Sequence, residues 1–143
     1  MKLTMHTGAH WQVELPADWI LKNDNQGVLK FKSSDGNYGL DIAVWNIQTM
    51  ERTEQDILNQ FSQTAMKVLD EMQGYQWSHN KVLLGAGDLL VDSLDADRLY
   101  RVVNRLIVDV PLVLNAGFHD YECTNITESN ACLTPLLQTV YLT

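Results

Sequence analysis

The sequence predicts an α+β fold: an antiparallel sheet of about six strands, covered by a long central helix and a C-terminal helix. Residues 54–73 place apolar side chains at helical spacing, whereas the segments on both sides alternate apolar and polar residues with a period of two. Only short turns separate the alternating segments, which favours antiparallel pairing of consecutive strands. We therefore expect an N-terminal hairpin, the central helix, a C-terminal meander and a closing helix in a single domain, residues 1–143.

The central helix is the element around which the rest of the chain is arranged. Thr53 is suited to cap its first turn, and Gly74 is suited to end it in the left-handed conformation. One arc of the helix carries an apolar stripe: Ile57, Leu58, Phe61, Ala65, Val68, Leu69 and Met72. We expect this stripe to lie against the sheet, with Phe61 and Leu69 buried and Lys67 in water.

Three alternating segments precede the helix. Residues 11–15 form a short strand that ends at Pro16, and residues 28–32 and 38–47 form a hairpin. The loop at residues 33–37 contains Asp-Gly and Asn, which supply the positive φ that tight hairpin turns require. The polar residues 22–27 are predicted to be a turn.

The N-terminal half also holds three of the four tryptophans. Trp11, Trp19 and Trp45 lie among apolar neighbours in the sequence, so we expect them in the core. Trp19 and Ile20 are expected to fold back onto that core after the turn at residues 16–19.

The second half contains a meander of three strands. Residues 88–94 and 99–108 form a hairpin around the loop at 95–98, and the third strand follows Pro111. The hairpin register is predicted from its charges. With that loop, Asp92 faces Arg101 and Asp88 faces Arg105, and opposite charges across a strand pair stabilise the register.

A closing helix is predicted over residues 128–142. Its apolar residues match the spacing of a core-facing helix: Leu133, Leu136, Leu137, Val140 and Tyr141. Pro135 lies inside this stretch, so either Thr134 caps a helix that has Pro135 in its first turn, or an earlier turn ends there.

The charge balance excludes some partners. Eighteen acidic and ten basic residues give a net charge of −8, which opposes contact with nucleic acid or anionic lipid. No export signal and no apolar run long enough to span a membrane is seen, so we expect a cytoplasmic protein. Cys123 and Cys132 are the only cysteines, and we expect both to be free thiols.

Two chemical readings centre on His119. With Cys123 and Cys132 it would supply three zinc ligands, and with Cys123 alone it would form the thiol–imidazole pair of a small hydrolase. No paired ligand motif supports the zinc site. Residues four apart on a strand are separated by roughly 13 Å, too far for the hydrogen bond that activates a thiol. We therefore predict no catalytic residue, no cofactor and no metal.

A protein-binding surface is predicted on the second hairpin, because its strands carry apolar residues on both faces. The central helix covers one face only. The other needs the closing helix, a second copy or a partner protein as its cover, and an open apolar face marks an interaction site. The predicted binding residues are Leu90, Asp92, Leu94, Leu99, Arg101, Val103 and Arg105.

The order of these features resembles the PsbP-like fold. The resemblance is carried by Leu15-Pro16 with Trp19, by the helix of residues 54–73 and by the strand at 99–103. This family includes the photosystem protein PsbP, the Ran-binding Mog protein and small bacterial proteins that accompany type VI secretion effectors. It implies a non-enzymatic protein that binds another protein: an adaptor or chaperone for a secreted effector, with an immunity-type toxin inhibitor as the alternative. A homodimer is a further arrangement that the prediction leaves open.

Overall fold

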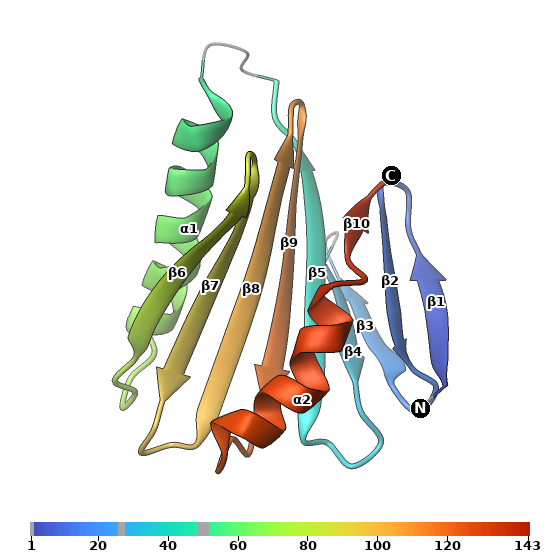
Figure 1. The fold of residues 1–143 in the computed structure, drawn as a ribbon, viewed down its shortest axis with the longest axis vertical. Coiled ribbons are helices and arrows are strands. Elements are labelled where there is room, and N and C mark those ends of the chain that lie inside the picture. Colours follow the sequence, from blue (N-terminus) through green and yellow to red (C-terminus); the bar gives the residue numbers. More distant parts are fainter. Residues whose placement is uncertain (1, 26–27, 49–51) are drawn as a thin grey trace.

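The computed structural model describes residues 2–25, 28–48 and 52–143. Within these residues the chain forms two antiparallel sheets and two helices (Figure 1). The predicted α+β class is confirmed. The strands exceed the predicted number of about six, because the larger sheet has seven strands and a second sheet has three.

The larger sheet has the strand order β3–β4–β5–β9–β8–β7–β6. Its strands have these bounds in chain order: β3 (Ile20–Asn25), β4 (Val28–Lys32), β5 (Tyr38–Asn46), β6 (Ser78–Gly85), β7 (Asp88–Asp95), β8 (Tyr100–Asp109) and β9 (Leu112–Asp120). The smaller sheet has the order β1–β2–β10, formed by β1 (Leu3–Thr7), β2 (Trp11–Pro16) and β10 (Tyr141–Leu142). The helices are α1 (Glu54–Asp70) and α2 (Ile126–Leu137).

Helix α1 is the predicted central helix, and it packs on β7 and β8. The Thr53 side chain accepts a hydrogen bond from the Asp56 backbone N–H at 3.1 Å, as a capping residue does. Ile57 and Leu58 are buried against β7, β8 and β9, and Leu69 is buried further along the helix. The orientation of the helix is therefore confirmed.

One flank of α1 departs from the prediction. Val68 is 60% exposed and Phe61 is only half-buried, although both belong to the apolar stripe. The reason is the placement of the helix: it packs on β7 and β8, and its other flank borders an open groove lined by β4, β5, β8 and β9. This flank becomes important for the candidate site.

Helix α2 lies on the opposite face of the large sheet (Figure 1). Its side chains Leu133 and Leu136 join the core formed with Leu114 and Phe118. The helix ends at Leu137, so the prediction of a helix to residue 142 is wrong. Pro135 cannot donate a backbone hydrogen bond inside the last turn, and the chain then straightens so that β10 pairs with β2.

The hairpin register also differs from the prediction. Asp92 lies opposite Val103 rather than Arg101, because the turn between β7 and β8 is at residues 96–99 rather than 95–98. The shift of two residues keeps every side chain on its predicted face. Arg101 and Asp92 therefore still meet, diagonally, at 2.7 Å.

Two further predictions near the N-terminus are wrong. The segment predicted as a turn at 22–27 is strand β3 as far as residue 25, because pairing with β4 outweighs its weak strand preference; residues 26 and 27 lie outside the described residues. Ile20 is exposed on this outer strand instead of folding onto the core. Trp11 and Trp19 are buried as expected, but Trp45 is 41% exposed, because it lies on the part of the sheet that α1 leaves uncovered.

Candidate functional site

The predicted binding face on β7 and β8 is the face that α2 covers. Arg101 and Val103 are buried there, and Arg101 donates a hydrogen bond to the Ser129 hydroxyl of α2 at 2.9 Å. Of the seven predicted residues only Leu99 is exposed, in the turn; Leu90, Asp92, Leu94 and Arg105 are half-buried. Helix α2 therefore covers the centre of this face, which was one of the alternatives that the sequence left open.

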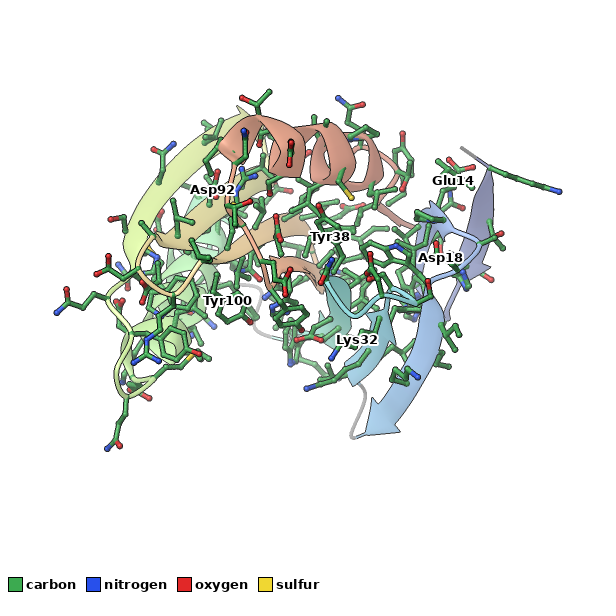
Figure 2. The ribbon with its side chains drawn as sticks, turned by 90° about the horizontal axis from the view of Figure 1, so that it is seen from below. Glu14, Asp18, Lys32, Tyr38, Asp92 and Tyr100 are labelled. Atoms are coloured by element: carbon green, nitrogen blue, oxygen red, sulfur yellow. The ribbon has the colours of Figure 1, made fainter. Side chains whose placement is uncertain are left out.

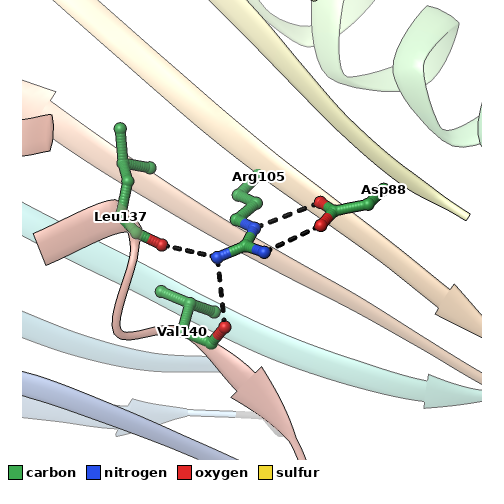
Figure 3. A network of polar contacts seen from close by, with 4 residues as sticks. All are labelled: Asp88, Arg105, Leu137 and Val140. Atoms are coloured by element: carbon green, nitrogen blue, oxygen red, sulfur yellow. Dashed lines mark hydrogen bonds and ion pairs between the residues drawn. The ribbon is translucent and has the colours of Figure 1, made fainter. Parts of the chain in front are cut away.

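Arg105 shows how firmly this face is joined to α2 (Figure 3). Its guanidinium donates two hydrogen bonds to the Asp88 carboxylate, at 3.1 and 2.8 Å. The same group donates to the carbonyl oxygens of Leu137 and Val140, at 2.7 and 3.2 Å. Arg105 therefore ties the end of α2 to the sheet, and we assign it a structural part in the fold.

The open surface lies on the other face of the large sheet, beside α1. A groove of about 440 Å³ runs between the exposed flank of α1 and strands β4, β5, β8 and β9. Its lining is mostly apolar, and its residues are Val28, Asp41, Ala43, Trp45, Gln60, Phe61, Thr64, Ala65, Val68, Leu69, Val102, Asn104, Asn115, Gly117 and His119.

The apolar wall of the groove is built by α1 and β5 together. The Trp45 and Phe61 rings are in contact, with their centroids 5.3 Å apart and their planes inclined by 54°. Val68 projects from the helix near the same rim, and it is the most exposed apolar side chain of the lining. Large apolar side chains that line a concave surface and stay exposed to solvent are typical of a binding site.

The floor of the groove is polar at its centre. Register places Asp41 of β5 opposite Gly117 of β9, and Gly117 in turn opposite Asn104 of β8. A Cβ atom on Gly117 would lie 2.7 Å from the Asn104 side-chain oxygen, closer than real Cβ contacts. Glycine is therefore what allows the Asn104 amide to occupy this part of the floor.

A hydrogen-bonded chain of three side chains closes one end of the groove. The Tyr100 hydroxyl lies 2.6 Å from His119 Nδ1, and His119 Nε2 lies 3.0 Å from the Asp41 carboxylate. Burial raises the pKa of Tyr100, so its hydroxyl stays protonated and can donate to the imidazole. Both ring nitrogens of His119 are thus engaged, one by Tyr100 and one by Asp41.

Aromatic rings extend this end of the groove. Tyr121 stacks on His119 with ring centroids 5.4 Å apart and an interplanar angle of 5°, and Tyr100 stacks on Tyr121 at 5.3 Å. The Lys32 ammonium lies 5.3 Å above the Tyr121 ring. Figure 2 shows Tyr100 and Lys32 on the side of the sheet away from α2, whereas Tyr38 lies beneath α2.

The cysteines lie away from this end of the groove. Cys123 is buried near Ser129 of α2, Asp120 and Arg101, whereas His119 points to the opposite face of the sheet. The structure therefore does not bring together the predicted thiol–imidazole pair. Both cysteines are free thiols, and burial raises the pKa of each. Cys132 lies beside Tyr38, also on the α2 side.

The sequence contained signals for the groove. Asp41, Ala43 and Trp45 alternate with the core residues of β5, and His119 lies on the same face of the neighbouring strand. The pattern shows that these side chains share a face, but it does not show that α1 leaves this face uncovered. That fact depends on where the helix sits, which only the structure gives.

Comparison with known proteins identifies the fold. Neither the protein-family models nor the curated proteins contain a match. Among solved structures, cyanobacterial PsbP (CyanoP) from Synechocystis sp. PCC 6803 matches with a TM-score of 0.68 and 16% identity, over 99% of this chain and 92% of that one. The Ran-binding protein Mog1p of Saccharomyces cerevisiae matches with a TM-score of 0.68 and 9% identity, over 99% and 96%.

The chain has a PsbP/Mog1-like fold. LpqN of Mycobacterium tuberculosis, described as involved in cell envelope biogenesis, also matches, with a TM-score of 0.53 and 17% identity over 99% of this chain and 91% of that one. The resemblance seen in the sequence is confirmed at the level of the fold. In the described part of this PsbP/Mog1-like chain, neither helix is long and apolar enough to cross a membrane.

Proposed function

We propose that the protein is a non-enzymatic binding module whose groove beside α1 receives an apolar segment of a partner protein. The observation that carries the proposal is the exposed apolar rim formed by Trp45 and Val68 on a groove of about 440 Å³. Burying these side chains under a partner removes apolar surface from water, which drives association. Mog1p, a Ran-binding protein with the same fold, supports a protein as the partner.

The charge of the groove favours an apolar partner segment. Among the described lining residues, Asp41 is the only carboxylate, and it is paired with His119. The other polar groups near the centre of the floor are uncharged amides, which can hydrogen-bond to a polypeptide backbone without requiring a charged ligand. A segment with apolar side chains and a few backbone donors or acceptors therefore fits the lining.

The hydrogen-bonded chain at the end of the groove argues against a hydrolase. The imidazole of His119 has Tyr100 on one nitrogen and Asp41 on the other, so the hydroxyl that it could activate as a nucleophile is that of Tyr100. Burial raises the pKa of Tyr100, which disfavours the phenolate that such a nucleophile would require. The chain is better suited to holding the floor rigid.

Within this proposal, we favour an adaptor or chaperone that keeps an apolar segment of a secreted effector out of water. This role follows the resemblance to small bacterial proteins that accompany type VI secretion effectors. An immunity-type inhibitor would use the same groove and is the second candidate. Co-expression with the partner distinguishes the two roles. A chaperone raises the yield of soluble partner, whereas an inhibitor abolishes the partner's toxic activity.

Site-specific cross-linking tests the groove. A photoreactive phenylalanine derivative at Val68 should cross-link a partner protein in cells, because this position lies on the rim. The same group at Tyr141, which is exposed on β10, is the matched control. Thr64→Arg, on the exposed side of the lining, should abolish the cross-link at position 68. Cross-linking from position 141 alone would contradict the proposal.

A further inference from the structure

Strand β6 is an outer strand of the large sheet, and among the described strands it pairs only with β7. The pairing is regular from Ser78, opposite Leu94, to Leu83, opposite Leu89. Apart from His79, every residue of β6 is exposed. A strand edge of this kind presents a row of backbone N–H and C=O groups that a further strand can bind.

The edge of β6 has little of the usual protection. Folded proteins block such edges with charges, prolines or bulges, but β6 has Lys81 as its only permanently charged residue, and its bulge comes after Leu83. Three consecutive apolar side chains at this edge are in water: Val82, Leu83 and Leu84 are 40%, 61% and 49% exposed.

The other outer strand of the sheet is better protected. Strand β3 contains the exposed Lys22, and its register shifts in the middle of the strand, between Leu21 and Asn23. A bulge at that place bends a strand and disrupts a continuous hydrogen-bonded ladder. Of the two outer strands, β6 is therefore better suited to pair with a strand from another molecule.

A second copy of the same edge is complementary to it by symmetry. In antiparallel pairing about a two-fold axis, each N–H donated by one copy is matched by the same donation from the other copy. We propose that two copies of this chain pair through β6 and form a homodimer with one continuous sheet. The proposal does not depend on the groove, which lies on the other half of the sheet beside α1.

The charges of β6 favour one register. An axis at Lys81 would place two ammonium groups directly opposite each other, which is destabilising. An axis at Leu83 would fall at the bulge. An axis at Val82 places the two Val82 side chains together and Lys81 of one copy opposite Leu83 of the other. We therefore place the two-fold axis at Val82.

The net charge gives the dimer a measurable salt dependence. Each chain carries −8, so two copies repel each other at long range. Strand β6 contains Lys81 and no carboxylate, so the paired strands themselves add no acidic charge to the interface. Added salt screens the remaining repulsion and should strengthen the dimer.

Sedimentation and cross-linking test the dimer. Wild-type protein at micromolar to millimolar concentration should reach twice the chain mass of 16.3 kDa, and the dimer should tighten as salt is added. Val82→Asp should leave a monomer with an unchanged circular dichroism spectrum, because this side chain is exposed and the two new carboxylates would lie directly opposite each other at the axis. Leu21→Asp on β3 is the matched control and should remain dimeric. Val82→Cys should be joined between copies by a short bis-maleimide.

Three outcomes would overturn the proposal. The first is a monomer at every concentration, including the case in which β6 pairs only with a different protein. The second is a dimer that survives Val82→Asp and is lost in Leu21→Asp, which would place the interface on β3. The third is a wild-type dimer in which Val82→Cys is never cross-linked, although cysteines at positions outside β6 are.

Discussion

Arg105 and Asp88 form a two-hydrogen-bond ion pair diagonally across neighbouring strands, since Arg105 lies directly opposite Leu90. The same guanidinium holds two carbonyl oxygens at the end of α2 (Figure 3). Only a planar group with several donors can satisfy all these acceptors at once.

Arg105→Lys tests this geometry. Lysine keeps the charge but cannot bridge the carboxylate and both carbonyls, so we expect a loss of about 1–2 kcal/mol in unfolding free energy. Arg105→Ala should lose about 2–4 kcal/mol, because it leaves the half-buried Asp88 unpaired. Urea unfolding measures both. Lys67→Ala removes an exposed ion pair with Glu71 and should change stability by less than about 0.5 kcal/mol. If Arg105→Lys and Lys67→Ala lost the same unfolding free energy, the structural role proposed for Arg105 would be wrong.

Gly117→Ala tests the floor of the groove. The new methyl group would displace the Asn104 amide, and we expect a loss of about 1–2 kcal/mol in unfolding free energy together with weaker partner binding. Gly85→Ala is the matched control, since nothing lies within 4 Å of a Cβ at that exposed position. Its stability should remain within about 0.5 kcal/mol of wild type. Partner binding unchanged in Gly117→Ala would show that the floor is not used.

The two flanks of α1 should respond differently to truncation. Leu58 is fully buried, so Leu58→Ala should cost about 2–5 kcal/mol through lost burial and a cavity. Phe61 is half-buried beside Trp45, so Phe61→Ala should cost less, about 1–3 kcal/mol, than a fully buried phenylalanine would. Urea unfolding compares the two variants. A larger loss for Phe61→Ala would mean that the groove is more closed than described.

Asp95 gives the protein a pH-dependent contribution to stability. Its carboxylate accepts backbone N–H hydrogen bonds from Gln76 at 2.8 Å and Arg98 at 3.0 Å, and the Gln76 bond is the largest cause that lowers its pKa below the ordinary value of 3.8. A lowered folded-state pKa means that the stabilisation is complete above pH 3.8 and is lost as pH falls towards the folded-state pKa. Asp95→Asn should therefore be less stable than wild type at neutral pH, and the difference should shrink below pH 3.8. A difference that is constant with pH would contradict this assignment.

The two thiols should be slow to react in the folded protein. Burial raises the pKa of Cys123 and of Cys132, so little thiolate is present at neutral pH. We expect two alkylated thiols per chain after denaturation without reductant, and much slower alkylation of the native protein. Rapid native labelling of Cys123 would show that α2 opens readily from the sheet.

The spacing of apolar residues predicted most of the long helices and strands. The long helix, its Thr53 cap and strands β5, β7, β8 and β9 are close to their predicted places, because their apolar residues recur at helix or strand spacing and turn residues separate them. Strand β3 was missed, because an outer strand paired on one side keeps a polar sequence. The turn before Tyr100 was placed one residue too early, and this error moved the register by two residues.

The predicted binding residues and the groove lie on different parts of the sheet. The sequence showed correctly that β7 and β8 are apolar on both faces, but it could not show that α2 lies over the face that includes Val103. Nor could it show that α1 would leave Trp45 uncovered. Where a helix sits on a sheet depends on the packing of side chains distant in sequence, which no local pattern records. The binding role of Leu90, Asp92 and Leu94, half-buried beside β6, stays a prediction.

The smaller sheet has a consequence for the rate of folding. Strand β2 pairs with β10, and the Glu14 backbone N–H donates to the Thr139 hydroxyl across 125 positions of sequence. Contacts between such distant segments require a large loop to close before any stabilisation is gained. The meander of β7, β8 and β9, which pairs neighbours in sequence, can form first and offer a surface to α2. The pairing of β10 with β2 should therefore be the last part of the sheets to acquire hydrogen-exchange protection during refolding.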